Sequence, residues 1–139
     1  MGTHNPTRAL ALICAAMMMA CSSNGNDGSP TPNPNGGGSG GGTGTVAATI
    51  TITATGVSPK TVTVPAGSRV MFVNNDGASH DVSSDPHPVH TDCPDINLVG
   101  FLSASQSRAT GNLNTARVCG FHDHDRPTDD SLRGTITIQ

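Results

Sequence analysis

The chain has 139 residues, a formal net charge of −3, and neither tryptophan nor tyrosine. Its few basic residues form no stripe along the sequence, so we do not expect nucleic acid as a partner. No internal repeat divides the chain, and its foldable part has the size of one ordinary domain.

The N-terminus predicts export. Arg8 precedes an apolar run over residues 9–20, which is too short to span a bilayer comfortably and ends in a small residue before Cys21. Cys21 and the three residues before it resemble a bacterial lipobox, with methionine in place of the usual leucine. We therefore predict a lipoprotein-type signal peptide over residues 1–20, lipidation of Cys21, and a lipid-anchored location in the bacterial cell envelope, periplasmic or at the cell surface. A plain signal peptide cleaved nearby is the alternative.

A linker is predicted over residues 21–44. After Cys21 this segment consists of Ser, Asn, Gly, Pro and Thr with almost nothing apolar, so it cannot bury enough surface to fold. As a flexible coil it would have a root-mean-square reach of roughly 25 Å. We expect it to tether one domain, residues 45–139, to a membrane.

Period-two alternation marks the strands of this domain. Residues 48–53, 61–64 and 134–139 alternate apolar and polar side chains, which is typical of half-buried strands. Residues 69–74 form a continuous apolar run, which predicts a central strand covered on both faces. Several short strands without a helical period predict an all-β fold, a Greek-key antiparallel β-sandwich.

All five histidines of this domain fall in two short windows, and each window holds one cysteine. The windows contain His80, His87, His90 and Cys93, and then Cys119, His122 and His124. Imidazole and thiolate together favour copper or zinc over hard cations. This clustering predicts a metal site, the alternative being solvated loop histidines and a disulfide.

Two spacings indicate how the histidines could share one ion. His122 and His124 are separated by one residue, so on an extended strand both point to the same face. His87 and His90 are three residues apart and need a turn, which the adjacent prolines favour. We therefore regard His87, His90 and His124 as candidate additional ligands. Neighbouring carboxylates could orient the imidazoles or simply be solvated: Asp81, Asp92, Asp123 and Asp125.

The order of these segments resembles the cupredoxin family, to which plastocyanin and azurin belong. A strand ending in Phe72-Val73-Asn74 is followed by His80, and Cys119-Gly120-Phe121-His122 precedes the last strand. The resemblance covers almost the whole predicted domain. It implies copper as the cofactor, held by His80, Cys119 and His122, and single-electron transfer with an unidentified redox protein as partner. We expect a monomeric electron carrier or copper-binding protein rather than an enzyme.

One departure from the cupredoxin pattern concerns the axial ligand. The family places a methionine a few residues after the second histidine, and residues 123–133 contain none. Met71, the methionine of the predicted domain, lies in an apolar strand, where core packing is expected. A backbone carbonyl, a carboxylate such as Asp123 or Asp125, or no ligand at all could occupy the axial position, with consequences for the redox potential.

The other departure is Cys93, which lies in a polar insertion after His80. Exported proteins meet an oxidising environment, and Cys93 and Cys119 are the two thiols left once the leader is removed and Cys21 is lipidated. If they pair, the site is all imidazole and closer to type 2 copper or zinc than to blue copper. The sequence leaves both arrangements open. The second one would make the protein a histidine-only copper-binding or copper-handling protein.

An enzymatic alternative comes from residues 120–124. They also resemble the Gly-Phe-His-x-His copper motif of copper-zinc superoxide dismutase. In that family further metal-binding histidines lie downstream, whereas no histidine follows His124 here. The order of features therefore favours copper binding over this enzyme.

Overall fold

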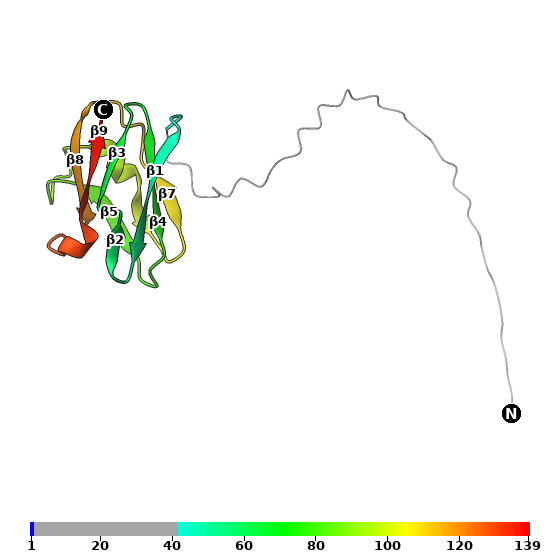
Figure 1. Cartoon of the computed structure of the whole chain (residues 1–139). Coiled ribbons are helices and arrows are strands. Elements are labelled where there is room, and N and C mark those ends of the chain that lie inside the picture. Colours follow the sequence, from blue (N-terminus) through cyan, green and yellow to red (C-terminus); the bar gives the residue numbers. More distant parts are fainter. Residues whose placement is uncertain (2–41) are drawn as a thin grey trace, which may run out of the picture. The chain divides into compact units, whose positions relative to one another are not determined.

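The computed structural model describes Met1 and residues 42–139 (Figure 1). Residues 2–20 of the predicted signal peptide, Cys21 and nearly all of the predicted linker lie outside these residues. Within the described part of the chain, no helix is long and apolar enough to cross a membrane.

The described residues form nine strands and two short 3-10 helices (Figure 1). In chain order they are β1 (Val46–Thr53), β2 (Gly56–Ser58), β3 (Thr61–Val64), β4 (Arg69–Asn74), β5 (His80–Ser84), η1 (Pro94–Leu98), β6 (Gly100–Leu102), β7 (Ser107–Ala109), β8 (Arg117–Asp123), η2 (Asp130–Leu132) and β9 (Gly134–Ile138). The four strands expected from the sequence correspond to β1, β3, β4 and β9.

Two sheets build the predicted β-sandwich, which is confirmed. One has the strand order β2-β1-β4-β7 and the other β3-β9-β8-β5-β6. Two pairings are parallel, β1 with β4 and β3 with β9, so the sheets are mixed rather than purely antiparallel. Parallel neighbours cannot be joined by a tight hairpin and need a crossover connection. Here the chain crosses between the sheets before each of these pairs is completed.

The core lies between the two sheets and consists mainly of aliphatic side chains. Ile50 and Ile52 of β1 are buried at alternate positions, as the period-two pattern predicts. In β4, which lies between β1 and β7 in its sheet, residues on both faces are buried, as the continuous apolar run predicts. Phe72 of β4 packs edge-to-face on Phe121 of β8, with ring centroids 5.1 Å apart. This contact joins the two sheets across the core.

The chain enters the domain at one end of the sandwich. The buried Arg69 donates from its backbone N–H to Thr45 O (3.0 Å) and from Nη1 to Gly42 O (3.1 Å). Close to it, Ala66 N donates to the carbonyl of Gln139, the residue after β9 (2.9 Å). Residues 42–45, through which the chain enters the domain, therefore lie at the same end of the sandwich as the C-terminal end of β9.

Strand β8 has two faces with different chemistry. Cys119 and Phe121 are fully buried members of the core. Because successive side chains of a strand point to opposite faces, Gly120 and His122 lie on the outer face of the sheet. His122 is nevertheless buried, with 1% of its surface exposed, since the segment between β5 and β6 covers this face. Phe121 pairs with Gly134, so His122 lies at the N-terminal end of β9, away from the chain entry.

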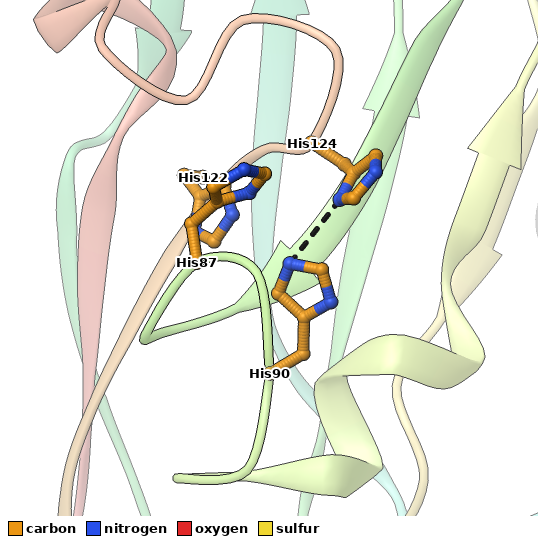
Figure 2. A group of neighbouring side chains, drawn as sticks. All are labelled: His87, His90, His122 and His124. Atoms are coloured by element: carbon orange, nitrogen blue, oxygen red, sulfur yellow. Dashed lines mark hydrogen bonds between the residues drawn. The ribbon is translucent and has the colours of Figure 1, made fainter.

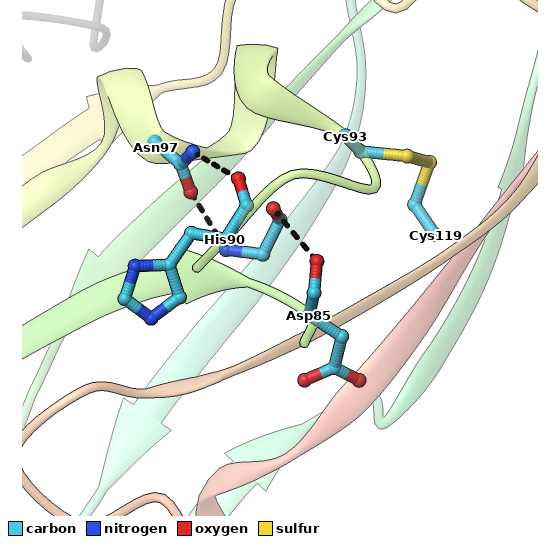
Figure 3. Close-up of a disulfide and its surroundings, with 6 residues drawn as sticks. Asp85, His90, Cys93, Asn97 and Cys119 are labelled. Carbon is cyan, nitrogen blue, oxygen red and sulfur yellow. Dashed lines mark hydrogen bonds between the residues drawn. A yellow bond between two sulfur atoms is a disulfide. The ribbon is translucent and has the colours of Figure 1, made fainter. Parts of the chain in front are cut away.

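A disulfide between Cys93 and Cys119 fastens the covering segment to β8 (Figure 3). Of the two arrangements that the sequence left open, the structure contains the disulfide. Cys119 therefore has no thiolate to offer a metal here.

Breaking this disulfide is expected to lower the free energy of unfolding by about 2–4 kcal/mol, because the loop that it closes regains its freedom in the unfolded chain. Urea unfolding with and without a reductant measures the difference. The Cys93→Ala/Cys119→Ala variant serves as the control, since the reductant should leave its unfolding unchanged. Labelling of Cys93 or Cys119 by a thiol reagent in the native, unreduced protein would contradict the pairing.

Candidate metal centre

Four histidine side chains converge on the outer face of β8 (Figure 2). The ligand nitrogens of His87, His90, His122 and His124 all lie within 4.8 Å of one another. Four nitrogens bound tetrahedrally to one ion, with bonds of about 2.0–2.1 Å, lie roughly 3.3–3.4 Å apart. The most widely separated nitrogens would have to approach each other by up to about 1.5 Å to bind one ion in this way.

Two segments supply two histidines each. His122 belongs to β8, and His124 follows the last residue of that strand, so both point to one side, as their spacing predicts. His87 and His90 come from the proline-containing turn between β5 and η1. Their rings lie over that of His122, with centroid distances of 5.6 Å and 5.2 Å. The predicted turn thus brings the two windows of the sequence together.

His122 has the geometry of a metal ligand. Its Nδ1 lies 2.7 Å from Asp85 Oδ1, and because a carboxylate only accepts, Nδ1 carries the proton. Its Nε2 is buried and has no hydrogen-bond partner among the described residues. Leaving such an atom unsatisfied costs about 1–3 kcal/mol. A metal ion would satisfy Nε2, and a carboxylate on the distal nitrogen is the usual companion of a metal-bound imidazole.

His90 and His124 face each other directly. His124 Nδ1 lies 3.2 Å from His90 Nε2 (dashed in Figure 2), close to the separation expected of two ligands on one tetrahedral ion. In the apo protein one nitrogen donates a hydrogen bond to the other. If a metal ion took the place of that proton, the lone pairs of both nitrogens could bind the ion.

The backbone of His90 is held in an uncommon conformation. Its φ is +51°, in the left-handed region that few residues other than glycine adopt. His90 N donates to Pro86 O (2.7 Å), and Asn97 Nδ2 donates to His90 O (2.9 Å). Asn97 Oδ1 in turn accepts from Ser84 N (2.8 Å), so Asn97 ties η1 and β5 to the turn (Figure 3). These bonds stabilise the conformation that aims the imidazole at the cluster.

The cluster lowers the pKa of His90. Burial is the largest cause, since it penalises the charged imidazolium, and the nearby histidines, His122 foremost, add repulsion. Asp81 acts in the opposite direction with a smaller effect. A lower pKa keeps His90 neutral, with a free lone pair, at pH values where an ordinary histidine begins to protonate.

The structure does not bring His80 or Cys119 to this cluster. His80 lies on the same side of β5 as the core residue Val82, with Nδ1 2.9 Å from Asp123 Oδ2 and Nε2 3.0 Å from Asp76 Oδ2. Cys119 and His122 are three residues apart in one strand, so their side chains point to opposite faces. Of the three ligands that the cupredoxin resemblance implies, only His122 belongs to the cluster.

The carboxylate that serves the cluster is Asp85, which the sequence analysis missed. Among the predicted aspartates, Asp123 contacts His80 instead, and Asp81 contributes its backbone oxygen to His124 N (2.7 Å). The one feature of the sequence that relates to the position of Asp85 is the glycine at position 120. A Cβ on Gly120 would overlap the Asp85 carboxylate, so the glycine leaves room for it, but this relation is visible only once β5 and β8 are paired.

Comparison with known proteins gives a fold but no sequence family. The sequence matches no protein-family model, and no curated protein sequence matches it. Solved structures, however, superimpose on the domain. The fold is that of the cupredoxins. A purple cupredoxin from Nitrosopumilus maritimus is 20% identical with a TM-score of 0.52, covering 66% of this chain and 99% of the other.

Two further structures have the same fold. A mutant fern plastocyanin is 18% identical with a TM-score of 0.52, covering 66% of this chain and 99% of its own. Amicyanin from Paracoccus versutus is 19% identical with a TM-score of 0.51, covering 68% of this chain and 81% of its own. The predicted cupredoxin-like sandwich is thereby confirmed.

The His90 environment gives a test in the apo protein. We expect the His90 imidazole to titrate below the ordinary histidine value of about 6.5, and His122→Ala to move its pKa upward, because the substitution removes both the burial and the repulsion that the His122 ring contributes. Since the folded pKa is lowered, His90 contributes stability that is present above about pH 6.5 and lost as the pH falls. Histidine NMR titration measures the pKa. An unchanged His90 midpoint in the His122→Ala variant would contradict the coupling.

Proposed function

We propose that this protein binds one copper ion between His87, His90, His122 and His124, and that it does so in the cell envelope, tethered by a lipid on Cys21. The observation that carries the proposal is the buried, partnerless Nε2 of His122, which faces three further imidazoles. The disulfide supports an all-histidine site, because it removes the thiolate that a blue copper site needs.

The donor set favours copper among the available metals. Neutral imidazoles suit copper and zinc, and divalent copper binds such sites more tightly than the other first-row ions. The cupredoxin fold of the domain agrees with this choice. When bound, copper would supply a couple between two oxidation states that differ by one electron. The protein supplies the ligands, a buried position for His122, and an exposed edge at His87.

Electron transfer to a redox protein is a second candidate function. The observation that favours it is the anchoring of the turn by the disulfide and by Asn97, which holds His90 in one conformation. Fixed ligands keep the reorganisation between oxidation states small. Reversible voltammetry of the copper-loaded protein tests this role, and copper release on reduction would instead favour copper handling.

Ligand substitutions distinguish the four-histidine site from the set His80, Cys119 and His122. We expect His122→Ala or His124→Ala to weaken copper(II) binding by more than about tenfold. His80→Gln should change the affinity little, because both ring nitrogens of His80 are within hydrogen-bond distance of carboxylates and lie outside the cluster. Competition with a chelator measures the affinity. Circular dichroism of each variant controls for folding.

The absorption spectrum is the companion measurement. An all-imidazole copper(II) site lacks the intense visible charge-transfer band of copper–thiolate bonding, so the loaded protein should be pale. A strong visible band that depends on His80 and Cys119 would contradict the proposal. Small, equal effects of all the histidine substitutions would remove the metal site altogether.

Tethering has its own test. Cys21→Ala is expected to move the protein from the membrane fraction to the soluble fraction without changing the Tm of the domain, because the predicted linker separates anchor and fold. Fractionation and thermal unfolding measure the two effects. A wild-type protein that is already soluble and cleaved at another bond would exclude the lipid anchor and leave the copper site untouched.

A further inference from the structure

We propose that Asp85 is the positioning residue of this site: its carboxylate fixes His122 in the tautomer whose Nε2 lone pair faces the ion, and its negative charge favours copper(II) over copper(I). This inference rests on the proposed copper site for its second half. The first half concerns the apo protein alone.

Asp85 is held by its backbone on both sides. Its N–H donates to Gly120 O in β8 (3.0 Å), and its carbonyl accepts from Asp92 N at the far end of the covering turn (2.9 Å). Cys93, the residue directly after Asp92, is held further by its disulfide to Cys119. The carboxylate therefore starts from a fixed point directly beside His122.

Gly120 creates the space in which the carboxylate lies. It is on the same face of β8 as His122, and a Cβ there would overlap Asp85 Oδ2. Any other residue would push the carboxylate off the strand. A substitution at Gly120 can therefore displace Asp85 while leaving both the acid and the histidine chemically intact.

The two carboxylate oxygens have different partners. Oδ1 accepts from His122 Nδ1 at 2.7 Å, while Oδ2 lies 3.8 Å from Nη2 of the half-exposed Arg133. The longer, solvent-screened pair is weak, so it does not compete for Oδ1. In the described part of the chain, Asp85 is the carboxylate that hydrogen-bonds to a cluster histidine.

The hydrogen bond determines which nitrogen of His122 can bind an ion. A neutral imidazole carries one proton, and the carboxylate retains it on Nδ1, which leaves Nε2 free to coordinate. An imidazole that donates to a carboxylate is also a stronger ligand. Four neutral imidazoles carry no negative charge, so the Asp85 carboxylate is a charge that stabilises the ion with the higher charge, copper(II), more than copper(I).

The apo protein tests positioning. Above pH 7.5, imidazole nitrogen shifts should report the Nδ1–H tautomer of His122 in the wild type. In Asp85→Leu the side chain offers no acceptor, so Nδ1–H loses its hydrogen-bond partner and the population of the Nδ1–H tautomer should fall. Asp92→Asn is the matched control, because its exposed side chain lies in the same turn without contacting the cluster. An unchanged tautomer population in Asp85→Leu would overturn the positioning role.

The copper-loaded protein tests the charge effect. Asp85→Asn should lower copper(II) affinity by about 10- to 100-fold and copper(I) affinity less, so the reduction potential should rise. Gly120→Ala should shift the potential in the same direction with the carboxylate retained, and Asp92→Asn should not. Equal losses for both oxidation states in Asp85→Asn would overturn the preference for copper(II).

The controls separate this inference from the proposed function. If the wild type binds no copper, the proposed site and the copper(II) preference both fail, while the tautomer measurement still decides the positioning role. If the wild type binds copper and the potential of Asp85→Asn is unchanged, only the inference about Asp85 charge fails. Asp85→Asn preserves size, so the test does not depend on whether Gly120→Ala folds.

Discussion

The alternation of side chains along β8 is the constraint on which the site depends. Odd-numbered positions of this strand face the core, where Cys119 joins the disulfide and Phe121 packs on Phe72. Even-numbered positions face outward, where Gly120 receives the Asp85 carboxylate and His122 presents its free nitrogen. One strand therefore packs into the core on one side and carries a histidine of the cluster on the other.

The two sides of β8 are coupled through the turn that follows β5. This turn begins at Asp85, which binds His122, and ends at Cys93, which binds the core side of the same strand. Between them lie His87 and His90, whose rings cover His122. The disulfide thus fastens the turn that carries His87 and His90 to the strand that carries His122. The domain keeps the cupredoxin sandwich, and the four histidines gather on the outer face of one of its sheets.

Local patterns in the sequence predicted the local features of the structure. Alternation identified β1, β3 and β9, and the spacing of His122 and His124 placed both on one face, because each depends only on neighbouring residues. Cys119 and His122 point to opposite faces because both lie within β8. The sequence does not show how far this strand extends, so it could not predict that Cys119 lies outside the cluster. Asp85 and the parallel strand pairs depend on which segments meet across the fold. Such pairings are set by the packing of the whole domain and leave no local signal.

The position where the chain enters the domain affects access to the histidines. Arg69 fixes Gly42 and Thr45 level with the C-terminal end of β9, whereas His122 lies beyond the opposite end of that strand. An anchored chain would thus be attached by the pole remote from its imidazoles. A partner protein could therefore approach the cluster along the axis of the sandwich without meeting the segment that leads into the domain.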